Sequence, residues 1–115
     1  EQAAPKGHPL FFKAYVATLI GLMHKEVMKD SDNIKARVVL GRLYLRSDPV
    51  AAQAVFRRVA RDAPNKPHSY YYLGFAQRLN GQARAAAASF RRCLDIDTKF
   101  IACDRLLRLL EGRGN

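Results

Sequence analysis

The chain has 115 residues, of which 49% are apolar and 26% charged, a balance that excludes a disordered or fibrous protein and predicts one soluble globular domain. Ala, Leu and Arg dominate while Gly and Pro are sparse, which favours helix over strand. Twenty Lys and Arg against ten Asp and Glu give a formal net charge of +10. We therefore expect an anionic partner, whether an acidic protein segment, a nucleic acid or an anionic membrane.

The first part of the chain combines a short irregular segment with a long apolar one. Residues 1–8 contain Pro, Gly and polar residues without periodicity, so we expect a flexible lead-in. From Pro9 to Asp30 the apolar residues recur at three- and four-residue steps, which predicts an amphipathic helix. In one interpretation this helix is the second member of a degenerate earlier pair and turns inward Leu19, Met23 and Val27. In the other, it contacts a partner or a second copy of the chain through Phe11, Phe12, Tyr15 and Leu22.

Five further helices are predicted in the rest of the chain. Turn and capping residues separate the periodic segments at Asp30 to Asn33, at Asp48-Pro49, at Ala63 to Pro67, at Asn80-Gly81 and at Asp95 to Thr98. The predicted helices span residues 34–46, 49–62, 68–79, 82–95 and 101–111. Because no segment alternates between apolar and polar residues as a strand does, the predicted fold class is all-α.

An internal repeat joins these helices into pairs. Leu40-Gly41 returns 33 residues later as Leu73-Gly74. After 34 residues, Ala52, Phe56, Arg57 and Arg58 return as Ala86, Phe90, Arg91 and Arg92. The pattern resembles the tetratricopeptide repeat family, whose period is about 34 residues. The first copy, residues 34–66, carries Leu40, Gly41, Tyr44, Ala52, Phe56 and Pro64 at the family positions. The second copy, residues 67–100, keeps Tyr70, Leu73, Gly74, Gly81, Ala86 and Phe90 and departs from the pattern at Gln77 and Thr98.

The resemblance implies a short right-handed superhelix of stacked helix pairs, preceded by the helix of residues 9–30 and capped by that of residues 101–111. Within each pair, Gly41 or Gly74 allows the first helix to approach the second closely. The phenylalanines, Phe56 and Phe90, are expected to fill the space between one pair and the next. The capping helix has Arg108 where the next Gly would fall, as expected if no further helix covers that face.

By the same resemblance, the first helix of each pair lines an inner groove that binds segments of other proteins. The expected groove residues are Lys35, Val38, Arg42, Leu45 and Arg46, then His68, Tyr71, Phe75, Arg78 and Leu79, with Ala102 and Arg105 on the capping helix. Arg offers charge-assisted hydrogen bonds and aromatic rings bury area, so this mixture suits an acidic or amphipathic segment of a partner protein. The alternative is that Tyr71 and Phe75 only support the fold and the arginines form a solvated face.

A second function class remains open, because a further set of cations lies on the predicted outer helices with few acids at helical spacing. Its members are Arg57, Arg58, Arg61, Arg84, Arg91 and Arg92. They could bind nucleic acid or an anionic membrane, or could simply form a soluble exterior. Two repeats are too few to read RNA base by base, and no aromatic residues for base stacking intersperse this set.

Catalysis finds no support, so we expect a binding protein and not an enzyme. His8, His24 and His68 lie far apart without metal-ligand spacing, and no nucleophile or phosphate-loop motif occurs, so neither a metal nor a cofactor is expected. Cys93 and Cys103 are expected to be neighbours inside the stack, either as a disulfide or, the favoured interpretation, as two buried thiols. The chain begins without Met, which favours a processed piece such as a soluble, periplasmic domain of a membrane-anchored protein.

Overall fold

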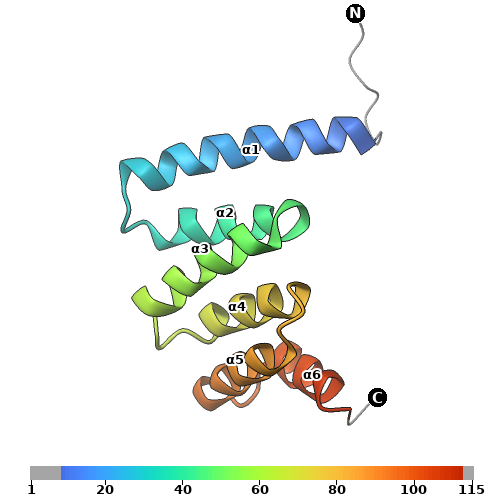
Figure 1. Cartoon of the computed structure of the whole chain (residues 1–115). Helices are drawn as coiled ribbons and strands as arrows, with labels where there is room; N and C mark the ends of the chain where they lie inside the picture. The colour runs from blue at the N-terminus through green and yellow to red at the C-terminus, as the bar shows by residue number, and fades with distance from the viewer. Residues whose placement is uncertain (1–8, 113–115) are drawn as a thin grey trace, which may run out of the picture.

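The computed structural model describes residues 9–112, and this range forms six α-helices and no strand (Figure 1). They are α1 (Pro9–Lys29), α2 (Ile34–Ser47), α3 (Pro49–Asp62), α4 (Pro67–Leu79), α5 (Ala83–Ile96) and α6 (Ile101–Leu110). Each predicted helix is present, with ends within one residue of the prediction, and the all-α class is confirmed. The expected lead-in, residues 1–8, lies outside the described residues.

Local side-chain chemistry explains where the helices begin and end. Asn33 Oδ1 accepts a hydrogen bond from the amide of Ala36 at 3.0 Å, which caps the start of α2. Asp48 caps α3 in the same way, and Pro49 follows in the first turn, where its missing amide hydrogen has no cost. After α4 the chain reverses at Gly81, whose φ of 77° lies in the left-handed region that favours glycine.

The helices form a linear stack in which each one packs mainly on the next in chain order. Figure 1 shows the stack running from α1 at one end to α6 at the other. Two helix pairs, α2 with α3 and α4 with α5, form its centre, and α3 packs on α4 between them. This is the arrangement of a helical repeat protein, in which each unit contacts only its neighbours.

Glycine and phenylalanine meet at the crossing inside each pair. A Cβ atom added to Gly41 would stand 2.6 Å from the ring of Phe56, and one added to Gly74 would stand 2.7 Å from the ring of Phe90. Both rings are fully buried, and the Phe56 ring also stacks on Tyr72 of the next pair, with centroids 5.0 Å apart. The predicted close approach at the glycines is therefore confirmed.

Hydrogen bonds between side chains link α4 to α5, and α3 to the turn after α4. Gln77, which replaces an aromatic residue, is buried, and its Oε1 accepts a hydrogen bond from Ser89 Oγ at 2.6 Å. Gln53 of α3 is bonded to both Asn80 and Gln82 in the turn after α4, at 2.7 and 2.9 Å. A hydrogen bond between Gln77 and Ser89 thus takes the place of an apolar contact inside the second pair. Both buried side chains have a hydrogen-bond partner, as buried polar groups require.

The interpretation of the cysteines as two thiols is wrong, because Cys93 and Cys103 form a disulfide. The expectation that they are neighbours inside the stack is confirmed: both are fully buried, with Cα atoms 6.6 Å apart. The bond joins α5 to α6 and fixes the capping helix on the second pair. Arg108 lies on the exposed side of this cap, as predicted, and its Nε donates to Asp104 at 3.0 Å.

The crossing predicts opposite effects of one substitution at two glycines. Gly74→Ala should lower the free energy of unfolding by about 1–3 kcal/mol, since the added methyl group presses on a buried ring. Gly21→Ala should instead raise it by about 0.5–1 kcal/mol, because that glycine is in a helix with no atom within 4 Å of the added Cβ. Urea unfolding followed by circular dichroism measures both; equal effects at the two sites would contradict the assignment of the crossing.

The disulfide predicts that reduction destabilises the protein. The two cysteines are 10 residues apart, and closing a loop of this length stabilises a fold by about 2–3 kcal/mol. Urea unfolding with and without reductant should show this difference, whereas a Cys93→Ala, Cys103→Ala protein should not respond to reductant. Two alkylated cysteines in the unreduced, denatured protein, detected by intact mass, would show that the bond does not form.

Candidate partner-binding groove

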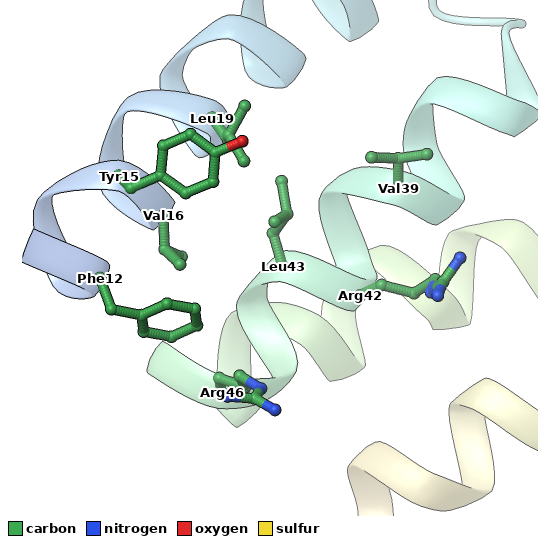
Figure 2. Close-up of a pocket in the computed structure, with 8 residues that line it drawn as sticks. All are labelled: Phe12, Tyr15, Val16, Leu19, Val39, Arg42, Leu43 and Arg46. Carbon is green, nitrogen blue, oxygen red and sulfur yellow. The ribbon is translucent and has the colours of Figure 1, made fainter. Parts of the chain in front are cut away.

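An open apolar groove of about 380 Å³ lies between α1 and α2 (Figure 2). Helix α1 contributes Phe12, Tyr15, Val16 and Leu19, and α2 contributes Val39, Arg42, Leu43 and Arg46. Only Val16 is buried, whereas Phe12 and Tyr15 are 46% and 55% exposed. The most apolar helix of the described chain is thus the one whose apolar residues are least covered.

Two guanidinium groups stand beside this apolar wall. The Arg46 guanidinium carbon lies 5.4 Å from the centroid of the Phe12 ring, and that of Arg42 lies 5.9 Å from the Tyr72 ring. These are cation–π distances, which hold the charges over aromatic faces while leaving both side chains exposed. Neither arginine forms an ion pair with a residue in the range 9–112. An incoming carboxylate could therefore bind either guanidinium without displacing an acid of the chain itself.

The remaining predicted groove residues divide into an exposed, mostly basic set and a partly buried, apolar set. Lys35, His68, Arg78, Leu79 and Arg105 are exposed, while Val38, Leu45, Tyr71, Phe75 and Ala102 are partly buried. Val38 and Leu45 pack against the first core cluster, so they also support the fold. Three rings of α4 and the ring of Phe100, just before α6, form a row. Ring centroids lie 6.1 Å apart for Tyr71 and Phe75, 5.5 Å for Tyr71 and Phe100, and 4.9 Å for His68 and Phe100, which meet edge-on.

The predicted groove residues of α2 and the exposed aromatic residues of the N-terminal helix, which the sequence analysis treated as two separate surfaces, line one groove. Arg42 and Arg46 of the predicted groove lie beside Phe12 and Tyr15 of the N-terminal helix, whereas Arg105 is on α6 at the opposite end of the stack. Phe11 is half-buried and stacks on Tyr15, with centroids 6.5 Å apart. The contact with a partner or a second copy, which the second interpretation of this helix expects, stays a prediction.

Residues of both expected kinds occur on α1. The inward set, Leu19, Met23 and Val27, is partly buried, while Phe12, Tyr15 and Leu22 remain exposed. Sequence reasoning missed Val39 and Leu43, which complete the wall on α2. Their spacing of four residues, one position after the Val38 and Arg42 of the predicted groove, was the available signal.

The outer cations are more paired than the sequence suggested. Arg58 Nε donates to Asp62 at 3.3 Å at a spacing of four residues, and Arg91 pairs with Glu111 across two segments. Arg92 lies over the Tyr70 ring at 5.5 Å. No cation of the predicted groove makes any of the ion pairs within residues 9–112. All cations of the predicted groove thus lack an ion pair in this range, whereas two of the six outer arginines, Arg58 and Arg91, form one.

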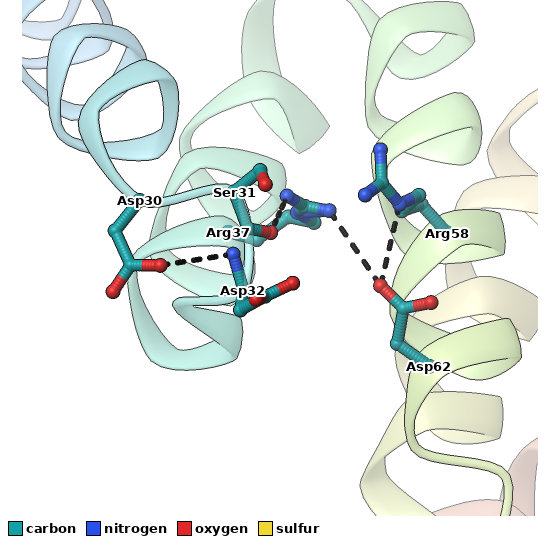
Figure 3. A network of polar contacts seen from close by, with 6 residues as sticks. All are labelled: Asp30, Ser31, Asp32, Arg37, Arg58 and Asp62. Carbon is teal, nitrogen blue, oxygen red and sulfur yellow. Dashed lines mark hydrogen bonds and ion pairs between the residues drawn. The ribbon is translucent and has the colours of Figure 1, made fainter.

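A buried arginine, Arg37, links the α1–α2 turn to α3 and so helps to hold α1 in position (Figure 3). Arg37 is 5% exposed; its Nη2 donates to the carbonyl of Ser31 in the α1–α2 turn, and its Nη1 lies 3.8 Å from Asp62 Oδ2 on α3. Arg58 donates to the same Asp62 oxygen. Within the turn, Asp30 Oδ1 accepts from the amide of Asp32 at 3.1 Å. The turn that orients α1 is thus tied to the first helix pair.

Residues 9–112 also lack two kinds of feature. None of the helices between residues 9 and 112 is both long and apolar enough to cross a membrane. In the same range, no three His, Cys, Asp or Glu side chains gather as a metal site requires.

The fold defines the class of protein: the chain has an all-α helical repeat fold that is like that of tetratricopeptide repeat proteins. Among solved structures, the crystal structure of MamA matches it with a TM-score of 0.80 over 97% of this chain, at 19% sequence identity. The chain spans 66% of the length of MamA, slightly less than two thirds, so the likeness concerns the fold. No family model matches the sequence, and neither does any curated protein.

The Arg37 contacts predict that one substitution can destabilise the packing of α1 on α2 without destabilising α5 and α6. Arg37→Leu should cost about 1–3 kcal/mol, since it removes hydrogen bonds of a charged group and leaves the Ser31 carbonyl without this donor. Amide hydrogen exchange should accelerate in α1 and in the α1–α2 turn, and much less in α5, which the disulfide holds. Arg57→Leu, on the exposed side of α3, is the control. Uniform acceleration in α1 and α5 would contradict the assigned role.

Proposed function

We propose that this chain is a protein-interaction module, without catalytic activity, that binds an acidic or amphipathic segment of a partner protein in the groove of α1, α2 and α4. One observation carries the proposal. Four exposed cations of α2 and α4 form no ion pair within the described residues and lie among partly exposed aromatic and aliphatic side chains; they are Lys35, Arg42, Arg46 and Arg78.

The composition of this surface favours a protein segment over a phosphate backbone. Arg, Tyr and Phe are residue types that contribute strongly to protein interfaces, because they combine large buried area with directional bonds. Phe12, Tyr15 and Leu79 are about half exposed, so a partner could bury much of each ring or chain. Burial of apolar area contributes about 25 cal/mol per Å², whereas nucleic-acid binding depends chiefly on counterion release at phosphates.

The disulfide supports a place of action for the module. Disulfides persist in oxidising compartments such as the periplasm and are rare in the cytosol. The bond between Cys93 and Cys103 therefore favours an oxidising compartment, of which the periplasm is one. A partner segment would then have to be present in that compartment.

Selection from a library of random peptides tests the proposal, with the 115-residue chain as the immobilised target. Peptides that combine Asp or Glu with apolar residues should be enriched. Arg42→Glu with Phe75→Ala should weaken their binding about 10- to 100-fold, because a charge-assisted contact is replaced by repulsion and a ring is removed. The matched control, Arg57→Glu with Val50→Ala on the exposed side of α3, should bind as the native chain does.

Circular dichroism must show the native helix content in both variants. The proposal fails if the enriched peptides lack acidic residues, or if the α3 control loses binding while the groove variant keeps it. In the second case, an affinity for single-stranded DNA or anionic vesicles that falls log-linearly with salt would assign binding to the outer cations instead.

A further inference from the structure

The turn before α2 has the same construction as the two turns that join one helix pair to the next. Four residues separate α1 from α2, α3 from α4 and α5 from α6. In each turn the fourth residue donates to the first: Asn33 to Asp30 at 3.0 Å, Lys66 to Ala63 at 3.3 Å and Phe100 to Asp97 at 3.1 Å. Helix α1 therefore stands where the second helices, α3 and α5, stand in their pairs.

Each of those second helices is covered by the first helix of its own pair, and within residues 9–112 α1 has no such cover. Ala52 and Phe56 of α3 are fully buried beneath α2. The residues 33 positions earlier, Leu19 and Met23 on α1, are only partly buried. The face of α1 that a first helix would cover is thus open.

The same comparison holds for the wall formed by α2. Val39 and Leu43 correspond, at the same 33-residue step, to Tyr72 and Ala76 of α4. In α4 these positions are covered: Ala76 is fully buried, and Tyr72 contacts Phe56 of α3 and Arg42 of α2. In α2 they line the groove beside α1 instead, and Val39 is 40% exposed. The groove therefore lies where the first helix of a preceding pair would pack, and residues 9–112 contain no helix at that position.

We propose that the groove between α1 and α2 binds its partner segment as an α-helix, which takes the place of the first helix of a preceding pair. This proposal rests on the proposed function and specifies the form of its ligand. The apolar side of the guest helix packs on Phe12, Leu19 and Leu43, and its acidic residues face Arg42 and Arg46. A guest of 14 residues, the length of α2, measures about 21 Å and matches the wall it covers.

The charge of the chain argues against a second copy as the guest. The first helices of the two pairs, α2 and α4, contain no acidic residue, so either one would place cations against Arg42 and Arg46. Two copies would in addition bring together formal charges of +10 each. An acidic partner meets no such repulsion. Its carboxylates can form ion pairs with Arg42 and Arg46, which have none within the described range.

Two synthetic peptides of 14 residues test the form of the guest. Both consist of Leu, Ala and Glu in the same amounts. One spaces its Leu residues at three and four positions, as a helix requires, and the other places its Leu residues at every second position, as an extended strand requires. A third peptide is the helical one with a central proline. Fluorescence anisotropy with the 115-residue chain measures their affinities, and amide chemical shifts of the labelled chain locate the bound peptide.

The helical peptide should bind roughly tenfold or more tightly than the alternating and proline peptides, because a central proline breaks the helix and alternation divides its apolar face. Its contacts should map to α1 and α2. Arg42→Glu with Arg46→Glu should weaken binding roughly tenfold or more and should create a preference for a peptide with Lys in place of Glu. Arg57→Glu with Arg84→Glu, an equal change of charge on α3 and α5, should have less than about a twofold effect.

Each contrary result has a distinct meaning. If the alternating peptide binds as well as the helical one, the guest is extended and the helix proposal falls, while the proposed function stands. If library-selected acidic peptides bind but map to α4 and α6, the position is wrong. If no acidic peptide of any pattern binds, both proposals fall. A dimer of the chain, seen by sedimentation and abolished by Arg42→Glu with Arg46→Glu, would replace the acidic guest by a second copy.

Discussion

The contact between a phenylalanine ring on the second helix of a pair and a glycine on the first sets the spacing of the whole stack. At Gly41 and Gly74 there is no room for a Cβ atom, so the ring lies directly on the backbone of the facing helix. The other side of the Phe56 ring then supports Tyr72 of the following pair. The Phe56 ring thus fixes both the distance within the first pair and the position of the next pair.

The two ends of the stack differ in how they satisfy this constraint. At the α6 end the disulfide and the burial of Leu107 close the core, and Arg108 replaces the glycine that would admit another helix. At the α1 end the phenylalanine position holds Met23, which is partly buried, and no first helix covers it in the described range. Incompletely covered apolar residues and arginines without an ion pair in the described range therefore coincide at the N-terminal end, which is where we propose that the partner binds.

The sequence was sufficient to predict the helices and the crossing glycines, because both depend on local periodicity and on a repeat that can be aligned with itself. It could not predict the state of Cys93 and Cys103, since their distance depends on the angle at which α6 docks. Arg37 gave no signal either: an arginine on a helix is ordinarily exposed, and its burial follows from the path of the Ser31 turn. The groove was predicted only in part, because α2 is apolar toward α1 as well as toward α3.

The groove also illustrates how a basic protein can restrict where it binds. On the outer helices, ion pairs neutralise Arg58 and Arg91, while Arg42 and Arg46 are held only by aromatic faces. A cation over a ring keeps its outward hydrogen-bond donors, and its position is fixed before a partner arrives, which reduces the entropy lost on binding. The adjacent apolar wall is also positioned before a partner arrives, because Arg37 donates a hydrogen bond to the Ser31 carbonyl in the α1–α2 turn. Net charge can then draw acidic segments toward many faces, and at this groove two arginines without an ion pair in the described range stand beside an apolar wall.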